Sequence, residues 1–169
     1  YGWRFLIKLW NASRFVSELL KDFKLSDKGE YALQPLEKWI LSKAEKLTKK
    51  VTEALDTCQF NIAVEETRNY AWHVFCDYYI EAVKDRLYKP ELYGEAKRKA
   101  AQYTLYTVLY RILQLLAPIS PHVTEEIYQN MYAEEKDCRS LHLSPWPKFN
   151  EKRLDEEAEK QGYLIVTVI

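Results

Sequence analysis

The sequence predicts an all-α fold, built as a helical bundle. Only four glycines and six prolines leave little material for the turns of a β sandwich. Apolar residues make up 47% of the chain, which is enough to bury a substantial core. These residues recur at spacings of three and four, the period of an amphipathic helix. Composition and periodicity therefore indicate the same fold class.

Two helices are predicted in the first third of the chain. The first covers residues 2–20, and its apolar positions are Phe5, Leu9, Ala12, Val16 and Leu19. A polar connector follows at residues 22–34. Pro35 can occupy the first position of a second helix, where its missing N–H costs nothing. The apolar stripe of that helix extends to about Thr57 and consists of Leu36, Ile40, Ala44, Leu47, Val51 and Leu55.

Three further helices are predicted between residues 61 and 131. The first of them, at 61–88, has two adjacent apolar rows and is expected to lie centrally in the bundle. A fourth helix is predicted at 95–116, and the prolines that follow it break the chain. Ser120 is a candidate N-cap for a short fifth helix that begins with Pro121 and extends to about residue 131.

The remaining residues divide the chain into two expected parts. Residues 1–150 form the helical domain, with an extended loop at 137–150, and residues 151–169 begin a C-terminal helical extension. The β-branched run at 164–169 could instead form a strand. Because the chain starts at Tyr1 and ends in an apolar run, both ends are expected to be cuts through a longer protein.

Little in the sequence points to catalysis. The three cysteines form no C-x-x-C pair, which fits a reducing compartment and disfavours both a disulfide framework and a zinc site. The histidines form no H-E-x-x-H pattern, and neither a glycine-rich phosphate loop nor a nucleophile elbow is present. We expect no catalytic residue, no metal and no cofactor in this chain. No apolar run reaches 18 residues and no signal peptide is visible, so we expect a cytoplasmic protein without a membrane partner.

The charge pattern is more informative than its total. The 25 basic and 25 acidic residues give a net charge of zero, which argues mildly against nucleic-acid binding. Residues 38–52 nevertheless hold five lysines against the single acid Glu45. A local basic stripe is what a polyanion would meet.

One face of the predicted second helix carries an aromatic ring beside a row of ammonium groups. Its members recur at i, i+4, i+7 and i+11 and are Trp39, Lys43, Lys46 and Lys50. Such a face can hold single-stranded RNA, the ring stacking on a base while lysines follow the phosphates. The alternative is a solvated lysine face beside a partly buried tryptophan. Because Trp39 precedes Ile40 of the apolar stripe, it is expected at the border of the core, where Trp39→Ala would weaken RNA binding more than folding.

A second candidate contact lies on the first helix. Asn11 and Arg14 are three residues apart and so share one face, beside Lys8 and Arg4. The planar donor fork of an arginine suits a phosphate or a base edge. The pair could equally cap a loop inside the protein.

Several segments together resemble the anticodon-binding domain of valyl-tRNA synthetases. Residues 8–16 (KLWNASRFV) are similar to its opening helix, and residues 36–42 (LEKWILS) to the start of its second helix. Residues 72–81 (WHVFCDYYIE) resemble the family's W-x-x-F-C-D-W-Y signature, with Tyr78 where Trp is more usual.

Two later segments extend the resemblance. Residues 115–128 (LLAPISPHVTEEIY) look like a stretch shared with the isoleucyl and leucyl relatives, with Ala117 where His is common, and residues 140–147 (SLHLSPWP) fit the loop that follows. From Asp155 onward the chain looks like an archaeal-type lead-in to a C-terminal extension.

The resemblance implies a helical bundle that binds the anticodon stem and loop of tRNA(Val). It places Lys38 and Trp39 near the anticodon bases, adds the exposed side of the fourth helix near Leu105 and Tyr106, and turns Asn11 and Arg14 toward the same groove. The parent enzyme would attach valine to tRNA using ATP with magnesium. Its HIGH and KMSKS signatures and its editing domain do not occur in this sequence.

We therefore expect the chain alone to bind tRNA without aminoacylation, and its other partners to be the catalytic domain and C-terminal extension of the same chain. Two alternatives stay open from the residues. One is the same domain of an isoleucyl- or leucyl-tRNA synthetase, and the other is a helical protein-interaction module with no RNA role.

Overall fold

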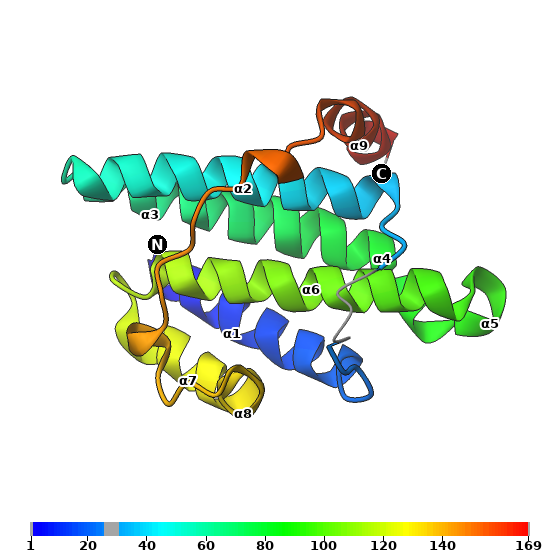
Figure 1. Ribbon diagram of the computed structural model, residues 1–169, viewed down its shortest axis with the longest axis horizontal. Coiled ribbons are helices and arrows are strands. Elements are labelled where there is room, and N and C mark those ends of the chain that lie inside the picture. The colour runs from blue at the N-terminus through cyan, green and yellow to red at the C-terminus, as the bar shows by residue number, and fades with distance from the viewer. Residues whose placement is uncertain (1, 26–30, 169) are drawn as a thin grey trace.

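In the computed structural model, every regular element among the described residues is a helix (Figure 1). The structure describes residues 2–25 and 31–168, and side chains in those ranges as far as Gly162. The N-terminal half contains α1 (Gly2–Leu19), α2 (Pro35–Asp56), α3 (Phe60–Asn69), η1 (Tyr70–Ile80) and α4 (Glu81–Tyr88). The C-terminal half contains α5 (Pro90–Tyr93), α6 (Glu95–Leu116), α7 (Pro121–Met131), α8 (Ala133–Lys136), η2 (Leu141–Leu143), η3 (Glu151–Arg153) and α9 (Glu156–Val168). The predicted all-α fold is confirmed.

The predicted helices agree with α1, α2, α6 and α7 to within a residue or so at each end. The predicted third helix is one run of α3, η1 and α4, and its middle is π-helical. The prediction of a possible strand near the C-terminus is wrong for residues 164–168, which belong to α9, and residue 169 lies outside the described residues. The division at residue 150 stays a prediction, and η3 and α9 pack against α2.

The local signals that start and separate helices are visible in the structure. Pro35 begins α2, where Gln34 and Glu37 form a reciprocal capping box. Pro121 likewise begins α7. Gly94 joins α5 to α6 at φ 88°, a left-handed conformation that favours glycine over any residue with a Cβ.

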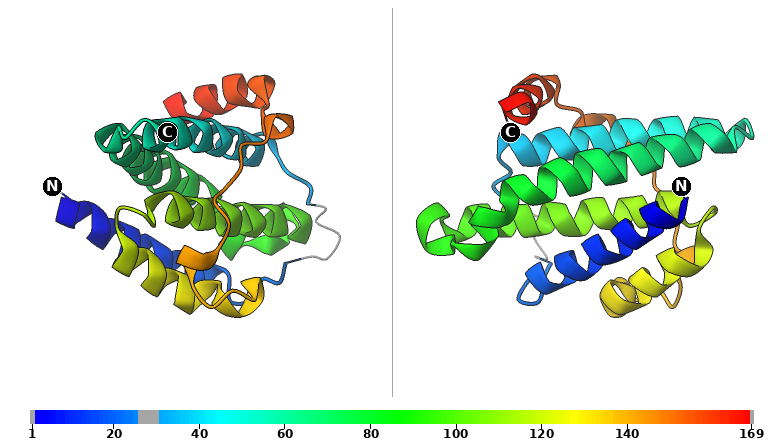
Figure 2. Two further views of the ribbon diagram at one scale, coloured as in Figure 1. Left: turned by 60° about the vertical axis from the view of Figure 1, so that its left-hand side comes forward. Right: turned by 180° about the vertical axis from the view of Figure 1, so that it is seen from behind.

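The bundle is layered around α6. In Figure 1, α2 and α3 lie on one side of α6, and α1, α7 and α8 lie on the other. Helix α6 packs against α1, α2, α3, η1, α4, α5 and α7, and 13 of its 22 residues are buried. The expectation that the third helix is central is therefore wrong, because α6 is covered on more sides. Helix α9 crosses α2 on the side away from α7 and α8 (Figures 1 and 2).

A buried ion pair joins α2 to the long third helix. The Glu37 side chain is fully buried, and its carboxylate accepts a hydrogen bond from Arg86 Nη2 at 2.6 Å. The hydroxyl of Tyr79 donates to the same carboxylate at 3.2 Å, and the backbone N–H of Gln34 donates at 3.0 Å. The carboxylate thus ties the start of α2 to η1 and α4, a role that the sequence pattern did not reveal.

Removing one partner of the Glu37–Arg86 ion pair should lower the stability of the fold substantially. Arg86→Met is expected to lower the free energy of unfolding by about 3–5 kcal/mol, because it leaves the Glu37 carboxylate buried without its cation. Urea unfolding measures the change. The double variant Glu37→Gln, Arg86→Met should be less destabilised than Arg86→Met alone, since glutamine is neutral and can still accept hydrogen bonds. Equal stability of the single and double variants would contradict the assignment.

Candidate nucleic-acid interface

The lysine face of α2 lies beneath the acidic start of α9. Glu159 accepts hydrogen bonds from Lys46 Nζ at 2.6 Å and from the hydroxyl of Ser42 at 2.5 Å. Burial alone would raise the pKa of Glu159, but the bonds from Lys46 and Ser42 hold that pKa below its ordinary value. Asp155 lies 3.9 Å from Lys38 Nζ, and its backbone N–H donates to Ser42. Two of the predicted RNA-contacting lysines therefore already face carboxylates.

The other two lysines of the predicted stripe are also engaged. Lys50 Nζ lies 2.8 Å from a carboxylate oxygen of Glu66 on α3. Lys43 Nζ lies 5.8 Å from the centroid of the Trp39 ring, within the range of a cation–π contact. An RNA phosphate at this face would have to compete with protein groups for Lys38, Lys46 and Lys50.

The expected position of Trp39 at the border of the core is wrong. Its side chain is only 2% exposed, because α9 covers it. A Cβ built on Gly162 would lie 2.3 Å from Trp39 Cγ, so the helix approaches the ring at a point where only glycine fits. The indole N–H is buried with no hydrogen-bond partner among the described residues. No base can reach this ring while α9 stays in place.

The fourth-helix residues of the predicted site are buried as well. Leu105 is 0% exposed and Tyr106 5%. The ring of Tyr106 packs between Phe23 and Tyr132, with centroids at 5.9 and 4.8 Å, and burial raises the pKa of its hydroxyl well above the ordinary value. The expectation that they lie on an exposed side of α6 is wrong, because that side faces α7, α8 and the segment after α1.

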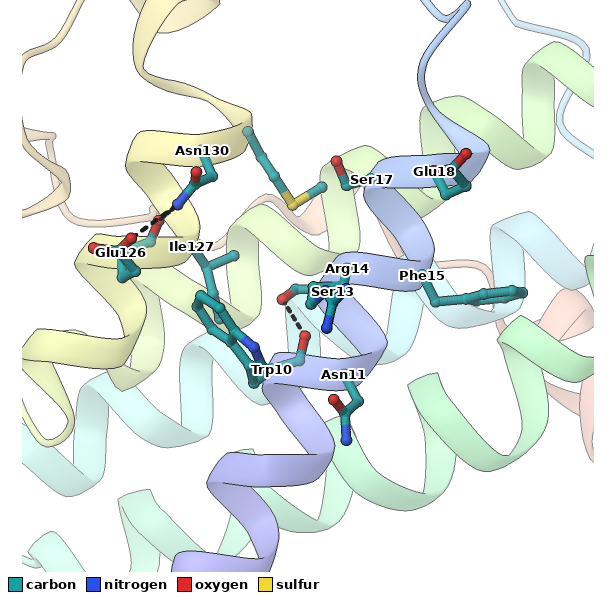
Figure 3. Close-up of a pocket in the computed structure, with 11 residues that line it drawn as sticks. Trp10, Asn11, Ser13, Arg14, Phe15, Ser17, Glu18, Glu126, Ile127 and Asn130 are labelled. Atoms are coloured by element: carbon teal, nitrogen blue, oxygen red, sulfur yellow. Dashed lines mark hydrogen bonds between the residues drawn. The ribbon is translucent and has the colours of Figure 1, made fainter.

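Asn11 and Arg14 are brought together on the surface as their spacing predicts. Both side chains are exposed and line a groove of about 670 Å³ between α1 and α7 (Figure 3). Arg14 forms neither an ion pair nor a hydrogen bond with any residue that the structure describes. Its guanidinium is therefore available to a ligand, unlike the lysines of α2.

The groove has further polar and aromatic walls that the sequence pattern did not single out. Trp10 lines it from α1, and Glu126, Ile127, Asn130 and Met131 line it from α7 (Figure 3). The amide of Asn130 donates to the carbonyl of Glu126 at 2.6 Å and to its carboxylate at 3.2 Å. These residues could not be assigned to one site from the sequence, because α1 and α7 are distant in the chain and meet only in the folded structure.

Two negative findings hold for the described part of the chain. No group of three or more His, Cys, Asp or Glu side chains is placed to hold a metal ion. Among the same residues, none of the helices has the length and apolar character that a membrane crossing requires.

The chain belongs to the family of anticodon-binding domains of tRNA ligases. Residues 37–169 match the sequence profile described as the anticodon-binding domain of tRNA ligase. The match runs from the first turn of α2 to α9, so it includes α7, one wall of the groove, and leaves out α1, the other wall.

Relatives of the chain are named valine–tRNA ligases. The protein of Thermococcus kodakarensis is 43% identical over 169 residues, and that of Pyrococcus furiosus is 42% identical over the same length. The protein of Methanothermobacter thermautotrophicus is 43% identical. In each case the alignment covers all of this chain and 18–19% of the relative, so the chain spans about a fifth of the length of the curated relatives that it matches.

The burial of Trp39 reverses the expected effect of its removal. Trp39→Ala should lower the free energy of unfolding by about 3–5 kcal/mol, because it leaves a large cavity between α2 and α9. Trp39→Phe should cost less, since the ring fills much of the same space. Chemical unfolding measures both changes. The matched control is Trp3→Ala on α1: Trp3 is 74% exposed, and its loss should change stability by no more than about 0.5 kcal/mol. Similar losses for Trp39→Ala and Trp3→Ala would contradict the burial.

Proposed function

We propose that this chain is the anticodon-recognition domain of a valine–tRNA ligase and binds the anticodon stem and loop of tRNA(Val). The observation that carries the proposal is the alignment of the whole chain with archaeal valine–tRNA ligases at 42–43% identity. The parent protein would be a cytoplasmic enzyme that attaches valine to tRNA with ATP and magnesium. Its reaction would belong to the part of the relatives that this chain does not span.

The groove beside α1 is the surface best suited to the RNA. Arg14 offers a planar set of N–H donors that matches phosphate geometry. It forms no ion pair with any described residue, although Glu18 and Glu126 also line the groove. Asn11 adds an amide that can donate to or accept from a base edge. The half-buried ring of Trp10 gives the same groove an aromatic wall.

The zero net charge is compatible with this proposal because charges are distributed unevenly. On α1 there are three basic residues and one acid, Glu18, which is paired with Lys21 at 2.6 Å. Lys8 is paired with Asp77 of η1, so the two arginines of α1 are the charges without an ion-pair partner among the described residues. On α2 the lysines are more numerous, but Lys38, Lys46 and Lys50 are matched by carboxylates. A polyanion approaching α1 therefore meets a local positive potential that the overall total hides.

Arg14→Gln should weaken binding of a tRNA(Val) transcript roughly tenfold, equivalent to about 1.4 kcal/mol, because one charged contact to phosphate is lost. The dependence of log affinity on log salt should become shallower by about 0.7–0.9, the contribution of one phosphate contact. Filter binding at several salt concentrations measures both quantities, with unrelated tRNAs for comparison. The control is Lys97→Gln, which removes one positive charge from the first turn of α6, beside α5 and away from the N-terminus (Figure 1).

Two results would contradict the proposal. Equal affinity for tRNA(Val) and unrelated tRNAs would remove the valine assignment. A salt-independent or undetectable interaction would indicate a protein-interaction module instead.

A further inference from the structure

A second hollow lies at the other end of α1, away from the groove that holds Arg14. It has a volume of about 250 Å³, and its lining residues come from α1, the end of α3 and the start of η1. Helix α1 packs against η1, and the two run side by side in Figure 2. Among the described residues, five line it and none of these is acidic. We call it the α1–η1 notch: Arg4, Arg68, Asn69, Trp72 and His73. Neither the expected site nor the α1–α7 groove includes these residues.

The imidazole of His73 in the notch is oriented by a contact with Asp77. His73 Nδ1 lies 3.0 Å from an oxygen of Asp77, one turn further along η1. The other oxygen of Asp77 accepts a hydrogen bond from Lys8 Nζ at 2.5 Å. Because Lys8 balances the carboxylate and Nδ1 is occupied, the Nε2 edge of the imidazole is the one left for a ligand.

The indole of the notch is also fixed in place. The Trp72 ring stacks on Phe5 with centroids 6.4 Å apart and an interplanar angle of 21°. Lys8 Nζ lies 4.4 Å from the centroid of the same ring. Both braces come from α1, so the wall of the notch forms only when α1 and η1 are packed together. A rigid wall of this kind lowers the entropy lost when a ligand binds.

Two guanidinium groups give the notch its charge. Arg4 is exposed and has no ion pair or hydrogen bond with any residue in the described ranges. Arg68 donates to the amide oxygen of Asn69 at 3.2 Å, which holds its side chain at the rim. Two planar guanidinium groups and one edge of an imidazole, with no carboxylate among the described lining residues, form a site for a tetrahedral oxyanion. The π-helical turn that carries Trp72 and His73 is a local structure often found at functional sites.

We propose that the α1–η1 notch binds one phosphate of the RNA backbone, with Arg4 and Arg68 as its ligands and the imidazolium form of His73 as a third donor. The proposal rests on the proposed RNA-binding function and adds a second phosphate site to it. Arg4 and Arg14 are ten residues apart on α1, about 15 Å along its axis. An RNA strand that contacts both arginines must span this distance with several nucleotides. Binding at the notch would therefore determine the direction in which the strand leaves the α1–α7 groove.

Substitution of the two arginines tests the notch. Arg4→Gln and Arg68→Gln should each weaken binding of the tRNA(Val) transcript by roughly three- to tenfold. Because both guanidiniums hold the same phosphate, the double variant should reduce the salt slope by about 0.7–0.9 in total, the value for one contact rather than two. Lys97→Gln again controls for the loss of positive charge, and circular dichroism melting shows that the variants are folded.

Ethylation interference adds a readout that general electrostatics would not change. Ethylating one particular phosphate of the transcript should weaken binding to the unmodified chain and have no further effect on the double variant. If the unmodified chain discriminates tRNA(Val) but both arginine variants bind with unchanged affinity and salt slope, the notch is wrong and the proposed function stands. If the unmodified chain shows no preference for tRNA(Val), it is the proposed function that fails.

Discussion

The approach of Gly162 to the ring of Trp39 determines which surfaces of this domain are available. A Cβ at Gly162 would lie 2.3 Å from the ring, so α9 reaches α2 at a distance that no other residue permits. The hydrogen bonds from Ser42 and Lys46 to Glu159 then fix the preceding turn of α9 on the same face. Close packing covers Trp39, and carboxylates pair with Lys38, Lys46 and Lys50, whose side chains stay about half exposed. On α1, by contrast, Arg4 and Arg14 are exposed and form no ion pair with any residue that the structure describes.

Much of the fold could be predicted because its signals are local. Apolar spacing determines where α1, α2, α6 and α7 lie, and Pro35 and Pro121 mark where two of them begin. The shared face of Asn11 and Arg14 follows from helical geometry alone. The π-helical middle of the third helix has no comparable signal, because its apolar rows fit an α-helix equally well.

The parts that sequence reasoning placed wrongly depend on contacts between distant residues. Trp39 borders an apolar stripe on α2, and only its contact with Gly162, 123 positions later, buries it. Leu105 and Tyr106 are buried because α6 is covered on more sides than its own periodicity indicates. The lysines of α2 look free in the sequence because their partners are distant: Glu66 belongs to α3, Glu159 to α9, and Asp155 directly precedes α9. A net charge of zero is thus compatible with a locally basic surface, and the numbers of basic and acidic residues do not show where that surface lies.

RNA is expected to meet the α1 side of the bundle, because α9 covers Trp39 on α2 and carboxylates pair with three of the α2 lysines. Photo-cross-linking tests it most directly, using a tRNA(Val) transcript with 4-thiouridine placed in the anticodon stem and loop, and mass spectrometry of the cross-linked peptides. Cross-links should fall within residues 2–19 of α1 and on the facing side of α7. Cross-links concentrated within residues 35–56 of α2 would contradict this expectation, because they would place the RNA on lysines that the structure pairs with carboxylates.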